Sequence, residues 1–187
     1  MSINLKKGQR IAVGQTNVTV GLGWSPNTGV GESFDLDCSV FLLDKNKMLK
    51  TEEHFVFFNN LKSPCGSVQH SGDDTTGMNS AGGDDEQIKI NINTLDPDVT
   101  ELLFVASIHT GQNFGRVRES YIRIVDNNDG SEIAKYELDE NFSVERSIEF
   151  GRLYKLEGVW KFDASGIGYD EELSFFVEKY YSGNIVK

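Results

Sequence analysis

The chain has 187 residues, of which 38% are hydrophobic and 25% charged, so it suits one folded domain and is not disordered as a whole. Its net charge of −11 disfavours direct binding to nucleic acid or anionic lipid, because both present negative phosphates. No signal peptide or membrane span of roughly 20 apolar residues is present, and two cysteines suit a reducing compartment. We therefore expect a cytoplasmic protein without membrane insertion, folded as a single domain over residues 1–187.

Short segments that alternate between apolar and polar residues follow one another along the chain, which is the pattern of half-buried strands. The expected strands are 18–24, 37–43, 54–58, 88–92, 102–108, 120–125, 133–138, 147–153 and 159–164. The turn-forming sequences at 127–130 and 157–158 predict hairpins. Many short strands with polar turns predict an all-β fold, a two-sheet β-sandwich.

One helix is expected near the C-terminus, within residues 169–180. Leu173, Phe176, Val177 and Tyr180 fall at helical spacing, and acidic residues precede them, where the positive end of a helix dipole favours negative charge. Gly183 is a candidate for the end of this helix. We expect this short C-terminal helix to pack on the sandwich.

Residues 70–86 form an acidic, glycine-rich segment with five carboxylates, four glycines and no lysine or arginine. Such a segment is either a solvated acidic loop or a cation site. Glycine lets the backbone curl so that oxygen atoms converge, and hard oxygen ligands on a flexible loop suit Ca²⁺. The sequence of this segment alone leaves both interpretations open.

A second acidic element lies at the start of the strand expected at 37–43. Asp35 and Asp37 are two residues apart, so they share one strand face and lie roughly 6–7 Å apart. Two carboxylates at this spacing can approach one cation or flank two. They can also meet water at the edge of a sheet, and a cation site is the interpretation we favour because the rest of the strand is apolar.

The acidic residues just before the strand expected at 88–92 repeat this arrangement. Asp84 and Glu86 lie an even number of residues before its buried isoleucines, so they are expected on the same face of the strand. Asp85 is expected to point to the opposite face. Asparagines after the third expected strand offer amide oxygens, a common Ca²⁺ ligand, although asparagine also caps turns. The candidate metal ligands are Asp35, Asp37, Asn59, Asn60, Asp73, Asp74, Asp84, Asp85 and Glu86.

Other metal and catalytic motifs fit poorly. The run 126–130 lacks the spacing of an EF-hand loop and reads as a hairpin turn, and the three histidines are scattered rather than spaced for zinc. The arginines at 116, 118 and 123 are expected to pair within so acidic a chain. Three hypotheses follow: a non-catalytic Ca²⁺-binding module, a metal-dependent hydrolase using the same carboxylates with His70 as its base, and an interaction protein whose acidic loop docks basic partners.

Several segments together resemble the TerD family of tellurium-resistance and stress-response proteins, over nearly the whole chain. The segments that carry the resemblance are 21–24, 34–39, 57–63, 66–68, 70–73, 76–77, 83–88, 111–115, 121–125 and 150–154. The resemblance implies a two-sheet β-sandwich that binds two Ca²⁺ ions at adjacent sites in acidic loops. It also implies a cytosolic bacterial protein that works beside other ter-operon proteins, including a membrane component, and it suggests no enzyme activity.

The matching acidic positions are Asp35, Asp37, Asp73, Asp84, Asp85 and Glu86, with Asn59 and Asn60 as carbonyl candidates. This chain departs from the family pattern at Asp74, where relatives usually carry asparagine. It also departs in the longer link 78–82, which lacks acidic residues that relatives often carry there.

Overall fold

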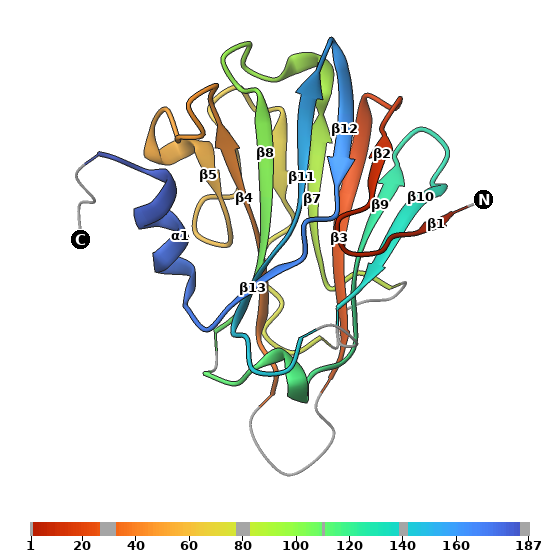
Figure 1. Cartoon of the computed structure of the whole chain (residues 1–187), viewed down its shortest axis with the longest axis vertical. Helices are drawn as coiled ribbons and strands as arrows, with labels where there is room; N and C mark the ends of the chain where they lie inside the picture. The colour runs from red at the N-terminus through yellow and green to blue at the C-terminus, as the bar shows by residue number, and fades with distance from the viewer. Residues whose placement is uncertain (1, 27–32, 78–82, 110, 139–141, 184–187) are drawn as a thin grey trace.

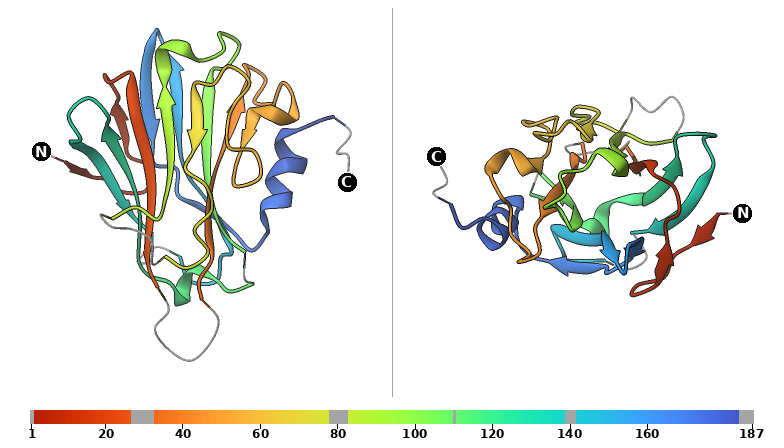
Figure 2. Two further views of the ribbon diagram at one scale, coloured as in Figure 1. Left: turned by 180° about the vertical axis from the view of Figure 1, so that it is seen from behind. Right: turned by 90° about the horizontal axis from the view of Figure 1, so that it is seen from above.

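The computed structural model describes residues 2–26, 33–77, 83–109, 111–138 and 142–183, and these form two β-sheets packed face to face, with one helix at the side (Figures 1 and 2). The first sheet has the strand order β1 (Ile3–Asn4), β10 (Glu132–Glu137), β9 (Arg118–Asp126), β3 (Asn17–Ser25), β7 (Glu86–Asn91) and β6 (Val68–His70). The second has the order β2 (Arg10–Ala12), β12 (Val159–Asp163), β11 (Ser147–Leu156), β8 (Glu101–Ile108), β4 (Leu36–Leu43) and β5 (Phe55–Val56), and β13 (Ile167–Tyr169) pairs with β11. The predicted β-sandwich with a short C-terminal helix is confirmed.

Three short 3₁₀ helices connect these strands. They are η1 (Glu52–His54), η2 (Ile92–Thr94) and η3 (Phe114–Arg116). The hairpins expected at 127–130 and 157–158 join β9 to β10 and β11 to β12. None of the helices in the described ranges is long and apolar enough to cross a membrane.

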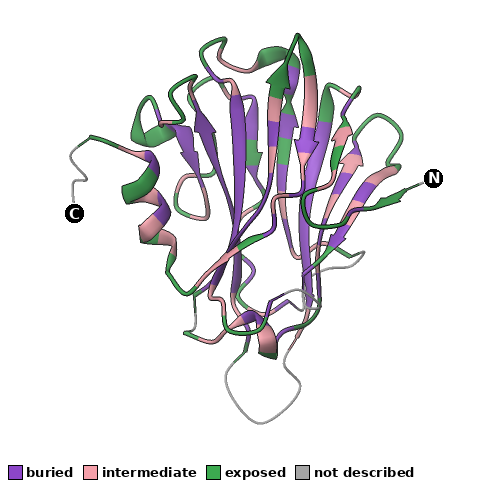
Figure 3. Cartoon of the chain, in the orientation of Figure 1, coloured by how far each residue is buried: buried purple, intermediate pink, exposed green. Residues whose placement is uncertain are grey.

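The main hydrophobic core lies between the two sheets, as the strand alternation predicts. On β4, Leu36, Cys38, Val40 and Leu42 point into this core, and the isoleucines of β7 meet them from the opposite sheet. Both faces of β4 are nevertheless buried along its whole length (Figure 3). The second face is covered because a smaller apolar cluster lies between this sheet and the C-terminal helix.

The helix α1 (Leu173–Tyr180) packs its apolar side on the outer face of the second sheet. Phe176 and Tyr180 are buried there against Phe41 of β4. The helix begins four residues later than the expected range, because Tyr169 belongs to β13, where it pairs with Ser147. The prediction that Gly183 ends the helix is wrong, since the helix stops at Tyr180 and the next residue is extended.

A buried glutamate on β11 anchors this helix. Glu149 is fully buried, and its Oε1 accepts hydrogen bonds from Lys179 Nζ at 2.8 Å and from the hydroxyl of Tyr180 at 2.7 Å. Its Oε2 pairs with Arg152 at 3.0 Å. Charged groups from the helix and the sheet therefore neutralise a carboxylate that would be costly to bury alone.

Gly151 on β11 leaves no room for a side chain, so its substitution should weaken the fold. A Cβ atom there would lie 2.2 Å from the ring of Phe162 and 2.9 Å from the carbonyl oxygen of Asp163. We expect Gly151→Ala to lower the free energy of unfolding by about 1–3 kcal/mol, the usual cost of overpacking. Urea denaturation measures this, with Gly14→Ala as the control, because a Cβ at Gly14 meets nothing within 4 Å. Equal stability of the two variants would contradict the tight packing.

The starts of β4 and β7 lie at the same end of the sandwich. Glu86, the first residue of β7, pairs with Leu22 near the end of β3, and β4 begins after the connection that follows β3 (Figure 1). The acidic residues that precede β4 and β7 are therefore delivered to one end of the molecule. This end also receives the loop that joins β6 to β7.

Candidate metal centre

Three carboxylates from two separate segments converge at this end. Asp35 precedes β4, Asp37 lies within it, and Asp73 is on the loop after β6; one carboxylate oxygen from each lies within 4.8 Å of the other two. Asp35 and Asp37 share a face because they are two residues apart on an extended chain. The structure therefore brings together the two acidic elements that the sequence analysis treats separately.

Two of the three carboxylates in this cluster have little access to water, because Asp37 is buried and Asp35 is half-buried, whereas Asp73 is exposed. Asp37 is only 5% exposed, and Oδ1 of Asp35 is buried without a hydrogen-bond partner in the described chain. Within the same described ranges, no lysine or arginine forms an ion pair with Asp35, Asp37 or Asp73. A cation among these oxygen atoms would supply the missing positive charge.

Burial and mutual repulsion raise the pKa values of Asp35 and Asp37. Burial, followed by the negative charges of Glu86, Asp35 and Asp73, raises the pKa of Asp37 to about 8. Burial and the neighbouring Asp73 also raise the pKa of Asp35. A full set of negative charges is therefore unfavourable in the protein alone, and a divalent cation would reverse this by favouring the ionised carboxylates.

Glu86 caps part of the unpaired edge of β4 by accepting a backbone hydrogen bond there. The peptide of Cys38 faces away from β8, at a point that β5 does not reach. Oε2 of Glu86 accepts the hydrogen bond of the Cys38 amide at 2.6 Å, and Nε2 of His70 lies 2.8 Å from the Cys38 carbonyl oxygen. Two side chains thus replace a neighbouring strand and satisfy a buried peptide group.

The hydrogen bond at Nδ1 of His70 determines which ring nitrogen carries the proton. Nδ1 accepts a hydrogen bond from the amide of Gly72 at 3.0 Å, so Nε2 carries the proton and donates it to the Cys38 carbonyl. The same Nε2 lies 3.4 Å from Oε2 of Glu86, and the side chains of both residues are fully buried. Burial raises the pKa of Glu86, although its hydrogen bonds with His70 and the Cys38 amide oppose this.

Asp74 orders the loop and is not among the three carboxylates that converge, so its role as a ligand stays a prediction. Its Oδ1 accepts hydrogen bonds from the amides of Thr76 and Gly77 at 3.0 and 3.1 Å, which is an Asx-type turn. Its own amide donates to Oε1 of Glu86 at 3.3 Å, so the loop is tied to β7. The link 78–82, in which the chain departs from the family pattern, lies outside the described residues.

Asp84 does not extend the buried face of β7, so the orientation expected for it is wrong. It precedes the first residue of the strand, and its carboxylate forms a bidentate pair with Arg123, at 2.7 and 3.1 Å from Nε and Nη2. The pairing of Arg123 within the chain agrees with the expectation for this arginine. Asp85 lies nearby, and its Oδ2 accepts a hydrogen bond from the amide of Trp24 at 2.8 Å.

This pair predicts a loss of stability that is separate from any effect on ions. The side chain of Asp84 is 1% exposed and that of Arg123 is 26% exposed, so Arg123→Gln leaves a buried carboxylate without its cation. We expect this variant to lose about 3 kcal/mol of unfolding free energy, whether or not a cation occupies the carboxylate cluster. The control Arg10→Gln breaks an exposed pair with Asp163 and should change stability little. Parallel chemical denaturation of both variants, with and without Ca²⁺, measures the difference.

The two asparagines lie in the tight turn after β5. The side-chain nitrogen of Asn60 donates to the backbone carbonyls of Phe55 at 2.7 Å and Glu53 at 3.2 Å. The backbone carbonyl of Asn60 accepts a hydrogen bond from the amide of Phe57. Asn59 is exposed at the tip of this turn. Neither residue is placed with the three converging carboxylates by any contact in the described chain, so their role as ligands stays a prediction.

Sequence reasoning missed the partners that hold the acidic residues in place. It treats His70 only as a possible base and Arg123 only as part of a basic cluster. The sequence does predict the buried position of Glu86, because this residue alternates in step with the buried Ile88 and Ile90 along the strand. No sequence pattern identifies Cys38 as the peptide that Glu86 and His70 satisfy, since that contact depends on how the sheets meet.

The molecule is thus an acidic two-sheet β-sandwich with a candidate cation site at one end. The chain belongs to the TerD family, since residues 1–180 match the TerD domain. It is 41% identical over 189 residues to the tellurium resistance protein TerD of Alcaligenes sp, and the match covers 96% of this chain and 97% of that protein. It is also 41% identical over 190 residues to general stress protein 16U of Bacillus subtilis (strain 168), with coverage of 96% and 97%.

Solved structures agree with the fold. The crystal structure of a homologue of telluride resistance protein (TerD) from Streptomyces coelicolor A3(2) matches with a TM-score of 0.73, covering 87% of this chain and 95% of that chain. At 18% identity, this likeness shows the shared fold alone. The family resemblance drawn from the sequence segments is confirmed.

Proposed function

We propose that the protein is a Ca²⁺-binding, non-catalytic module of the cytoplasmic stress response and tellurium resistance. The observation that carries the proposal is the convergence of Asp35, Asp37 and Asp73, with carboxylate oxygens within 4.8 Å of one another. All three ligands are hard oxygens, one of them on a loop, which suits Ca²⁺ better than the softer transition metals. The relatives named for tellurium resistance and general stress supply the biological setting.

The ion would act by ordering the loop that follows β6. Asp73 belongs to this loop, whereas Asp35 directly precedes β4 and Asp37 lies within it, so one cation would tie the loop to the sandwich. An ordered loop can present a surface to a protein partner. The proposal therefore includes docking to other ter-operon proteins, among them a membrane component. It also includes a second, adjacent Ca²⁺, as family membership implies.

A metal-dependent hydrolase is less well supported by the geometry. His70, the one base considered for it, has both ring nitrogens engaged by backbone groups, and its side chain has no exposed surface. A general base must reach the proton that it removes. The carboxylate cluster is therefore better suited to holding an ion than to turning over a substrate.

Calorimetric titration of the metal-free protein with CaCl₂ and MgCl₂ tests the proposal. We expect Ca²⁺ to bind in the micromolar to millimolar range more tightly than Mg²⁺, and to raise the melting temperature relative to the protein in EGTA. At a thousandfold excess over its dissociation constant, one ion adds about 4 kcal/mol to the free energy of unfolding. Absence of binding heat, together with the same melting temperature in Ca²⁺ and in EGTA, would overturn the proposal.

The raised pKa of Asp37 predicts that Ca²⁺ affinity depends on pH. Below its pKa of about 8 this carboxyl is protonated in the ion-free protein, so Ca²⁺ must displace a proton to bind. We expect the affinity to rise about tenfold per pH unit between pH 6 and 8 and then to level off. Titrations at pH 6, 7 and 8 measure this, and an affinity that does not change over this range would contradict it.

A further inference from the structure

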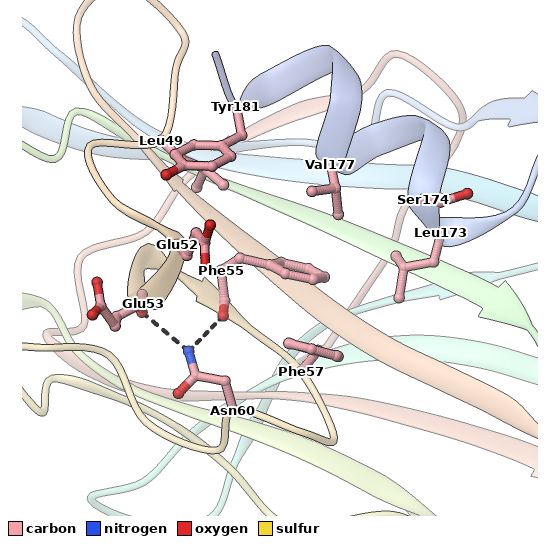
Figure 4. A pocket seen from close by; sticks show the side chains of 10 residues that line it. All are labelled: Leu49, Glu52, Glu53, Phe55, Phe57, Asn60, Leu173, Ser174, Val177 and Tyr181. Carbon is pink, nitrogen blue, oxygen red and sulfur yellow. Dashed lines mark hydrogen bonds between the residues drawn. The ribbon is translucent and has the colours of Figure 1, made fainter. Parts of the chain in front are cut away.

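A groove that none of the three clustered carboxylates lines runs between α1 and the segment that carries β5. Its cavity volume is about 470 Å³, within the usual range for small-molecule sites. Side chains from α1 form one wall, and side chains from around η1 and β5 form the other (Figure 4). The apolar and aromatic lining residues are Leu49, Phe55, Phe57, Leu173, Val177 and Tyr181.

The wall on the β5 side is built as a rigid stack of aromatic rings. Phe55 and Phe57 stack with centroids 4.3 Å apart at an interplanar angle of 12°, and Phe55 stacks on the buried Phe41 at 4.4 Å. Asn60 fixes the turn by donating to the carbonyl oxygens of Phe55 and Glu53 (Figure 4). The groove is therefore largely pre-formed, which reduces the ordering cost of binding.

The rim of the groove carries a single sign of charge. Glu52 and Glu53 line it, and among the residues that the structure describes no lysine, arginine or histidine does. In the described part of the chain, neither glutamate takes part in an ion pair. Aromatic ring faces attract cations as well, so both the rim and the wall favour a positively charged group.

From this combination we propose that the groove binds a small amphipathic cation, with an aromatic or aliphatic body and an amine head. The body lies against the rings of Phe55 and Phe57 and the apolar side of α1. The ammonium group lies at the rim, beside Glu52 and Glu53. A carboxylate or phosphate in the same place is disfavoured by repulsion from these two glutamates.

Three probes with the same indole body and different charge test this: tryptamine, which is cationic, tryptophol, which is neutral, and indole-3-acetate, which is anionic. Each is titrated into ¹⁵N-labelled protein in EGTA, so the outcome does not depend on Ca²⁺. We expect tryptamine to shift the amide signals of Asn60 and Ser174 and to bind about fivefold more tightly than tryptophol, the scale of an exposed ion pair. Indole-3-acetate should bind more weakly than tryptophol.

Charge-matched variants then locate the head group. The double variant Glu52→Gln/Glu53→Gln should lower tryptamine affinity at least fivefold and leave tryptophol affinity unchanged. The control Glu171→Gln/Glu178→Gln removes the same charge from exposed positions that do not line the groove, and should change neither. Equal affinities for the three probes, an equal loss in both double variants, or signal shifts confined to another part of the protein would each overturn the proposal.

Discussion

Replacing Asp37 with asparagine is expected to abolish most of the stabilisation that we propose Ca²⁺ gives the protein. Asp37 is the most buried member of the converging cluster and the one whose pKa is raised to about 8. Asparagine has nearly the same shape, so the fold should persist while one of three anionic ligands is lost. At a Ca²⁺ concentration that adds about 4 kcal/mol to the wild type, the variant should gain less than about 1 kcal/mol.

In the absence of Ca²⁺, Asp37→Asn should be more stable than the wild type at pH values near 8. Because the pKa of Asp37 is higher in the folded state than its ordinary value of 3.8, the folded state binds more protons than the unfolded state between about pH 4 and pH 8. The stability contributed by this group is present at low pH and is lost as pH rises toward 8. Asparagine cannot ionise, so in EGTA at pH 8 Asp37→Asn should be more stable than the wild type.

Thermal and urea denaturation in EGTA and in Ca²⁺ measure both effects. The matched control is Asp98→Asn, which changes an aspartate that is 65% exposed and pairs with Lys50 rather than with the cluster. It should keep the full Ca²⁺ response. Equal Ca²⁺ stabilisation of Asp37→Asn and the wild type would remove Asp37 from the proposed site.

Replacing Glu86 with alanine is expected to produce the largest loss of stability among the acidic residues. Its carboxylate accepts hydrogen bonds from the amides of Cys38 and Asp74 and lies beside the buried His70. Alanine leaves two buried N–H groups without their acceptor, at about 1–3 kcal/mol each, and opens a cavity as well. We expect a total loss of about 3–5 kcal/mol in the free energy of unfolding.

Hydrogen exchange separates this explanation from a general loosening of the protein. The Cys38 amide should exchange much faster in Glu86→Ala, whereas amides at the far end of β4 should change only with global stability. Glu86→Gln keeps one acceptor oxygen and should lose roughly half as much stability. The exposed control Glu178→Ala should have little effect. A loss below about 1 kcal/mol for Glu86→Ala would contradict the edge-closing role.

The strands and the helix face could be predicted because burial imposes a period on the sequence. Alternation along β4 and β7 identifies the residues that enter the core, and the spacing of Phe176 and Tyr180 identifies the buried side of α1. The short strand β13 escapes such reasoning, since three residues are too few to show a period. Its pairing with β11 moves the start of the helix beyond the expected position.

The candidate site could be predicted only in part, because side chains alternate between the two faces within a strand but not outside it. Asp35 and Asp37 were expected to share a face, and they converge with Asp73. Asp84 was expected on the same face as Glu86, yet β7 begins at Glu86, so Asp84 lies outside the strand in which side chains alternate regularly between the two faces. The carboxylate of Asp84 therefore turns to Arg123, a partner that no local pattern specifies.

The neighbouring residues Asp73 and Asp74 illustrate the same limit. Both belong to the acidic loop, but Asp73 reaches the cluster while Asp74 is 4% exposed and accepts hydrogen bonds from its own loop. Composition identifies a loop able to surround a cation. Which of the two carboxylates joins Asp35 and Asp37 depends on the turn that Asp74 makes and on the hydrogen bond that ties this loop to Glu86.

A crystal structure of the Ca²⁺-loaded protein is the most direct test of the proposed ion site. We expect electron density for an ion at about 2.3–2.6 Å from carboxylate oxygens of Asp35, Asp37 and Asp73, the usual Ca²⁺–oxygen distance. Crystals of Asp37→Asn grown in the same Ca²⁺ concentration should lose that density. Ca²⁺ bound elsewhere, with these three carboxylates contacting only water, would show that they do not form the ion site.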